Sequence, residues 1–166
     1  MTLIDVHSER PSNPVDVIEL IAAQNDWSFE RSGDDEITIS VKGSWSDYHV
    51  AFSWMEDIEA LHIACAFDIK VTETRKMEVM KLLALVNEQL WIGHFDLWQA
   101  EGVVMYRNAL LLAGQVEASD EQIEALLETA LESCERFYQS FQFVVWGGKN
   151  ARDSFDHALI ETVGEA

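Results

Sequence analysis

Apolar and polar positions along the chain change their period several times, and each change predicts the end of one element and the start of another. Asn13, Pro14 and Asp16 suit the cap and first turn of a helix, which we expect over residues 13–24. From residue 27 the period becomes two, which predicts a hairpin around a turn at residues 33–35. A third strand follows near residues 48–54, and a fourth near residues 61–69.

The fourth predicted strand has one apolar face and one face of mostly small residues. The small face carries Ala60, His62, Ala64 and Ala66. Side chains of this size would let a helix pack closely against the sheet, so we expect a helix there.

The second half of the chain begins with a helical pattern whose apolar positions run from Met77 to Leu90 and which we expect to end near Trp91. Gly93 opens an alternating run that predicts a strand to about residue 98. After a short turn, residues 103–112 form a long and largely apolar strand, which we expect to be central in the sheet and buried on both faces.

The longest helix is predicted behind Ser119, because Gln122 lies three residues on and completes a capping box. Gly147 and Gly148 would end this helix by supplying a residue free to adopt positive φ. A last short helix is expected over residues 151–163.

The resulting order, α-ββββ-α-ββ-αα, separates runs of strands from runs of helices. It predicts an α+β fold with an antiparallel sheet flanked by helices. We expect residues 1–12 to be a flexible tail and residues 13–166 to form a single domain, since no repeat, linker or low-complexity tract divides the chain.

The chain is strongly acidic, with 30 Asp and Glu against 11 Lys and Arg and a net charge of -19. This charge repels phosphate backbones and anionic lipid, so nucleic acid and membranes are poor candidate partners. The first residues offer no apolar run of signal-peptide length, and no stretch approaches the roughly 20 apolar residues that span a bilayer. We therefore expect a cytoplasmic protein.

Catalytic or metal chemistry would draw first on the histidines. His94 and Asp96 share one side of a predicted strand, and His62 and Asp68 share a side of another, but no HxxxH or HExxH pattern is present. A structural role is the better interpretation for these side chains. We expect no catalytic residue, no cofactor and no metal.

The two cysteines, Cys65 and Cys134, lie within apolar patterns and suit core positions in a reducing compartment. The sequence leaves a disulfide between them open but does not require one. Trp146-Gly147-Gly148-Lys149 is not a phosphate-binding loop, because its glycines end a helix instead of opening one.

Six tryptophans are too many for every ring to be buried in one small core. Some should lie at an interface, where tryptophan is enriched. Trp45, Trp54 and Trp98 sit on or beside predicted strands and are our candidate protein-binding residues.

One segment, VNEQLWIGHFDLWQAEGVVMYRNALLL, resembles the central signature of the YbjN family: a helix ending in Asn87, then Gly93-His94-Phe95, then Tyr106-Arg107. NPVDVIELIAAQNDW, LHIACAFDIKV and ESCERFYQSFQFVVWGGK resemble the alphaproteobacterial branch. The resemblance implies a fold like that of type III secretion chaperones, a frequent homodimer and a role in bacterial sensory transduction, without an established enzyme activity.

Three functions follow from these observations. The leading hypothesis is a non-enzymatic protein-binding module: a regulator of bacterial signalling or a chaperone-like adaptor, a homodimer, that holds an apolar segment of an unidentified protein partner. The alternative is a small-molecule sensor with a ligand pocket between sheet and helices, lined by tryptophan, His62 and His94. The third is a hydrolase or metal enzyme that uses His94, Asp96 and a neighbouring carboxylate.

Overall fold

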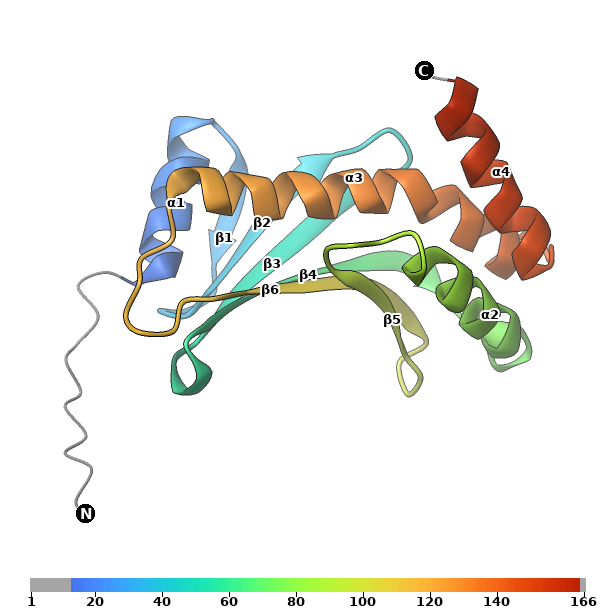
Figure 1. The fold of residues 1–166 in the computed structure, drawn as a ribbon, viewed down its shortest axis with the longest axis horizontal. Coiled ribbons are helices and arrows are strands. Elements are labelled where there is room, and N and C mark those ends of the chain that lie inside the picture. Colours follow the sequence, from blue (N-terminus) through green and yellow to red (C-terminus); the bar gives the residue numbers. More distant parts are fainter. Residues whose placement is uncertain (1–12, 165–166) are drawn as a thin grey trace, which may run out of the picture.

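The computed structural model describes residues 13–164, with side chains through residue 160. Its elements are α1 (Pro14–Gln24), β1 (Ser28–Arg31), β2 (Glu36–Lys42), β3 (Asp47–Met55), β4 (Ala60–Lys70), α2 (Lys76–Asn87), β5 (His94–Trp98), β6 (Val103–Leu111), α3 (Asp120–Val145) and α4 (Ala151–Gly164) (Figure 1). Short 3₁₀ turns, Glu56–Ile58 and Glu73–Arg75, precede β4 and α2. The α+β class and the order α-ββββ-α-ββ-αα are confirmed. The expected tail, residues 1–12, lies outside the described residues.

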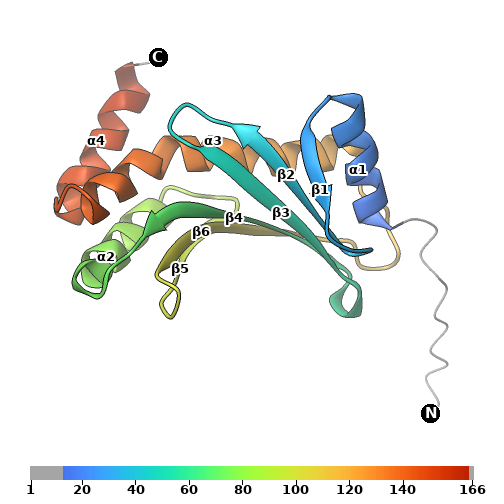
Figure 2. The same ribbon diagram turned by 180° about the vertical axis from the view of Figure 1, so that it is seen from behind.

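All six strands form one antiparallel sheet in the order β1-β2-β3-β4-β6-β5. Helix α3 runs along the sheet and contacts β4 and β6, α1 contacts β1 to β3, and α2 contacts β5. In both ribbon views α3 lies on one side of the sheet, and no helix of the described residues lies over the other side (Figures 1 and 2). The sheet therefore has one packed face and one uncovered face.

The core lies between the sheet and α3 and is centred on aromatic rings. Phe95 of β5 lies 5.7 Å from Phe67 of β4 and 5.5 Å from Phe141 of α3, measured between ring centroids. Phe137 and Tyr138 complete the contacts from α3. Edge-to-face and tilted pairs of this kind add to the free energy gained by burying the rings.

The predicted helix signals are confirmed at several ends. The Asn13 side chain accepts a hydrogen bond from the Val15 backbone, which caps α1. Ser119 and Gln122 form both hydrogen bonds of the capping box of α3. Gly148, just beyond α3, has a φ of 65°. Local sequence chemistry therefore sets these boundaries.

Three expectations are corrected. No described helix packs on the small face of β4, because α3 lies on the opposite, apolar face. Strand β6 is internal, between β4 and β5, but it is not buried on both faces: Leu111 is 71% exposed. Helix α2 ends at Asn87 and not near Trp91, because the Asn87 side chain turns to bind the backbone of β5.

A candidate binding surface on the uncovered sheet face

The face of the sheet opposite α3, called the open face from here on, can be mapped from the strand register. Ala51 of β3 pairs with Ala64 of β4, which pairs with Arg107 of β6, which pairs with His94 of β5. Because side chains alternate between the two faces of a sheet, every second residue along each strand lies on the same face as these four. The open face thus comprises Ser28, Glu30, Glu36, Thr38, Ser40, Lys42, Asp47, His49, Ala51, Ser53, Met55, Ala60, His62, Ala64, Ala66, Lys70, His94, Asp96, Trp98, Val103, Met105, Arg107, Ala109 and Leu111.

Small side chains occupy the middle of the open face. Ala51, Ala64 and Ala66 lie on the neighbouring strands β3 and β4, and Ala109 extends them onto β6. Larger apolar side chains lie toward the ends, with Met55 and Leu111 at one end and Trp98 at the other, all well exposed. This arrangement gives a shallow apolar strip that another segment can approach closely.

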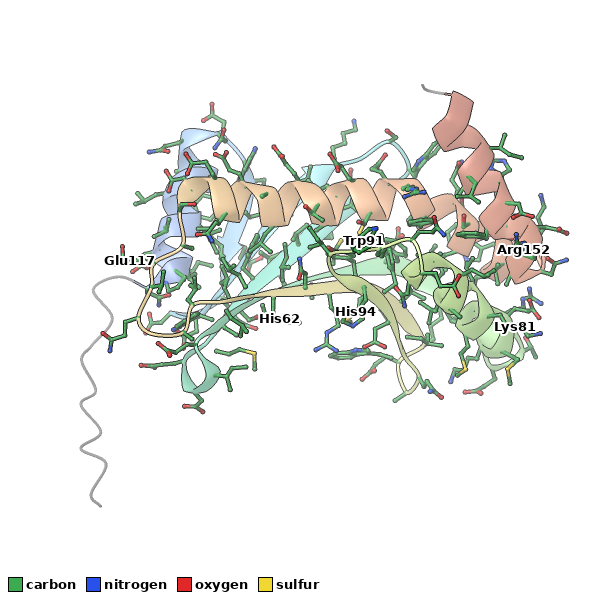
Figure 3. All side chains as sticks on the ribbon, in the orientation of Figure 1. His62, Lys81, Trp91, His94, Glu117 and Arg152 are labelled. Atoms are coloured by element: carbon green, nitrogen blue, oxygen red, sulfur yellow. The ribbon has the colours of Figure 1, made fainter. Side chains whose placement is uncertain are left out.

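Arg107 organises a polar cluster beside this strip. Its Nε donates to Nε2 of His62 at 3.3 Å, and its Nη1 lies 3.2 Å from Oδ2 of Asp96. Its guanidinium carbon lies 6.0 Å from the ring centroid of Trp98, within the range of a cation–π contact. His62 and His94 both project from the sheet on the side away from α3 (Figure 3). These neighbours hold Arg107 in place at the centre of the cluster.

The surroundings of His62 favour its neutral form. Burial lowers the pKa of His62, and the nearby Arg107 and His94 lower it further, since each disfavours a second positive charge. Because Nε2 accepts from Arg107, the proton of neutral His62 lies on Nδ1. His94 and Asp96 lie on one side of β5, as expected from the sequence. In the structure His62 and Arg107 lie beside them.

The structure separates the three tryptophans predicted to bind protein. Trp98 is 45% exposed and lies on the open face, and Trp45 is 47% exposed in the β2–β3 loop. Trp54 is only 8% exposed and packs into the core, so it cannot form part of a surface. The expectation that some tryptophans would be exposed is confirmed, but Trp54 leaves the candidate set because its side chain points to the packed face of β3.

Sequence reasoning missed the most exposed tryptophan, Trp91, at 99% exposure. It lies in the loop between α2 and β5 (Figure 3). The loop is anchored on both sides: the Asn87 amide bonds the backbone of Phe95, and the Tyr106 hydroxyl donates to the carbonyl oxygen of Ile92 at 3.2 Å. The hydrophobic pattern of the sequence could not show that this loop is anchored at both ends and exposes the indole of Trp91.

Gly93 fits the same loop for steric reasons. Its φ is 72°, and a Cβ at this position would lie 2.1 Å from the Tyr106 hydroxyl. Asn87, Gly93, Phe95 and Tyr106, which carry the resemblance described above, therefore act together to fix the junction between α2 and the sheet.

The described residues were also searched for metal ligands, reactive cysteines and membrane-spanning helices. Among the described residues no group of three or more His, Cys, Asp or Glu side chains could hold a metal ion. Both cysteines are buried and free; contact with the Cys65 thiol, together with burial, raises the pKa of the Cys134 thiol. A search of the described helices for one long and apolar enough to cross a membrane finds none.

Fold and surface thus define a class: a small α+β protein with a six-stranded antiparallel sheet whose helices leave one face uncovered. The chain belongs to the YbjN family, described as "Putative bacterial sensory transduction regulator", which matches residues 14–143. No curated protein matches the sequence.

Two solved structures are similar to the chain. One is "Crystal structure of YbjN, a putative transcription regulator from E. coli", with a TM-score of 0.55, 9% identity and coverage of 76% of this chain and 88% of that one. The other is "Crystal Structure of the ExsC-ExsE Complex", with a TM-score of 0.49, 19% identity and coverage of 74% and 93%. At such identity the likeness to the E. coli protein shows the fold alone.

Proposed function

We propose that this chain is a non-enzymatic, cytoplasmic regulatory protein whose open face holds an apolar segment of a partner protein. The observation that carries the proposal is the open face itself: a strip of alanines with exposed Met55, Leu111 and Trp98 around it and no described helix above it. Contiguous exposed apolar surface of this kind marks interaction sites. Membership of a family described as a regulator supports the same role.

The strip suits a docked helix or strand for a steric reason. Alanine side chains let a neighbouring backbone approach the sheet closely, and the larger residues at the ends limit where the segment can lie. The Arg107 cluster beside the strip supplies donors that orient a polar group on the partner. Such a surface acts by binding and positioning, as an adaptor or a chaperone-like protein does.

The test is capture of the partner from the native cell extract, followed by mass spectrometry. In Ala64→Trp the indole would occupy the strip, and the partner should be lost. Ala125→Trp is the matched control, because Ala125 is exposed on α3. Circular dichroism and thermal unfolding show whether both variants fold. Equal capture by wild type and both variants would refute the open face as the binding site.

We also propose that the protein forms a homodimer. Exposed apolar residues outside the strip support this, above all Trp91 and Ile92 beside the edge strand β5. Light scattering over a wide range of concentrations tests it, and a strict monomer at high concentration would contradict it.

The second candidate function is a small-molecule sensor, and a cavity beside α3 favours it. A cavity of about 530 Å³ lies where the sheet meets α3 and is lined by Val41, Tyr48, Leu131 and Glu135, among others. None of the expected lining residues, tryptophan, His62 or His94, contributes to it. A thermal-shift screen with nucleotides, metabolites and metals tests this function, since a ligand at 100 times its Kd should add about 2.7 kcal/mol of stability.

A further inference from the structure

A hollow lies at the rim of the open face, where β3 begins and β4 ends. The hollow has a volume of about 630 Å³ and is lined by Trp45, Asp47, His49, Phe67 and Asp68, among others. The antiparallel pairing of β3 and β4 brings Asp47, the first residue of β3, to the same end of the sheet as Asp68. An exposed indole and two exposed carboxylates therefore surround one space.

The Asp68 carboxylate is held in place by a side chain of α3. The hydroxyl of the buried Tyr138 donates to Oδ1 of Asp68 at 2.7 Å. Burial and the neighbouring Asp68 raise the pKa of Tyr138 to about 12, so the donor is a neutral phenol at physiological pH. The hydrogen bond uses Oδ1 and orients the carboxylate.

None of the ion pairs among the described residues includes the carboxylates of the hollow. The described ion pairs involve Arg31, Lys76, Lys81, Arg107 and Arg152, and none of them includes Asp47 or Asp68. Lys42 lies opposite Asp47 in the register of β2 and β3 but makes no described ion pair with it. Lys70 donates to the carbonyl oxygen of Glu101. Asp47 and Asp68 are therefore two exposed carboxylates without a described ion pair, in a chain of net charge -19.

We propose that the hollow receives a basic side chain, arginine or lysine, from the partner segment that docks on the open face. The cation would lie against the face of Trp45 and pair with Asp47 and Asp68. Cation–π contacts and charge-assisted hydrogen bonds both strengthen when the site is covered by a partner. A purely apolar segment would instead desolvate two carboxylates without compensation, which is costly.

This inference rests on the proposed function and specifies the chemistry of the partner: an apolar segment with a basic residue at one end. The first probe is a short peptide that alternates leucine with arginine, compared with the same peptide carrying neutral citrulline. We expect the arginine peptide to bind wild-type protein about tenfold more tightly than the citrulline peptide in calorimetric titration.

Two pairs of substitutions separate a specific pocket from the general negative charge. Asp47→Asn with Asp68→Asn should remove the preference for arginine, and Trp45→Ala should weaken it. The control is Glu121→Gln with Glu124→Gln, which changes the net charge by the same amount on α3 and should preserve the preference. An equal loss in the control would overturn the inference, since any acidic surface would then serve. An arginine peptide that does not bind wild type would also overturn it.

The outcome for the proposed function is read separately, by capture of the native partner. If Ala64→Trp loses the partner while the double aspartate variant retains it at wild-type affinity, the open face stands as the binding site and the basic anchor is wrong. If Ala64→Trp and Ala125→Trp both retain the partner, the proposed function fails.

Discussion

At the scale of single residues, His62 should make stability depend on pH. Its folded-state pKa lies below the ordinary value of about 6.5 because of burial, Arg107 and His94. When the pH falls below about 6.5, the unfolded chain takes up the proton before the folded one does, so the free energy of unfolding decreases until the folded-state pKa is reached. The contribution is fully present above about pH 6.5.

Urea denaturation at several pH values between about 7.5 and 5.5 checks this sign. His62→Gln retains an acceptor for Arg107 and has no proton to gain, so its stability should fall less with pH than that of wild type. The two proteins differ only at residue 62, so the difference between their slopes reports on that side chain. Identical slopes for the two proteins would exclude His62 as the source.

The two thiols give a second prediction at this scale. Cys65 and Cys134 are both buried, and the contact between them together with burial raises the pKa of Cys134. The thiolate is the reactive form, so the folded protein should not react with a thiol reagent over minutes. Both cysteines should react once the protein is unfolded in denaturant. Rapid modification of either residue in the folded protein would contradict the buried placement.

Residue identities predicted some of these features and not others. Apolar flanks predicted buried cysteines, and strand alternation placed His94 and Asp96 together on one side of β5. The sequence did not show that Trp54 is buried and Trp98 exposed. Both lie in strands with alternating apolar and polar residues, and which face of the sheet is buried depends on where α3 packs. It missed Trp91, whose exposure results from a loop held by distant partners.

At the scale of elements, Asn87 ties α2 to the edge strand β5. Its side-chain amide donates to the Phe95 carbonyl at 3.0 Å and accepts from the Phe95 amide at 2.8 Å. Asn87→Ala leaves two partly buried backbone groups without these partners, so the free energy of unfolding should fall by about 1–3 kcal/mol. Gln89→Ala, at an exposed position in the same turn, should change it by no more than about 0.5 kcal/mol. Denaturant unfolding measures both, and equal effects would contradict the bracing role.

The elements themselves were largely predictable, because period and capping chemistry act locally. The order of all ten helices and strands named above, the cap of α1 and the capping box of α3 follow from short stretches of sequence. The packing of one element on another does not. The small face of β4 suits a helix, and yet the described helices lie on the opposite side, where the larger apolar residues bury more surface. The sequence alone therefore could not show which face of the sheet is left uncovered.

At the scale of the whole molecule, excess negative charge and an uncovered apolar strip act together. Charge repulsion between copies keeps such a strip from causing indiscriminate association. It also favours partners that bring positive charge, which agrees with the acidic hollow at one end of the open face. Salt should weaken this selectivity, since exposed charges are largely screened beyond about 8–10 Å at physiological ionic strength.

The excess negative charge includes a row of glutamates on α3, where Glu124, Glu128 and Glu132 follow at intervals of four residues and repel one another. Like charges at this spacing destabilise a helix by a few tenths of a kcal/mol per pair. Glu128→Lys turns two repulsive pairs into attractive ones, so stability should rise by about 0.5–1 kcal/mol at low salt and by less at about 0.5 M salt. Glu121→Lys makes the same change in net charge but removes an acidic group from the first helical turn, where it interacts well with the helix dipole. A comparable gain in both variants would show that net charge, and not the row of glutamates, limits stability.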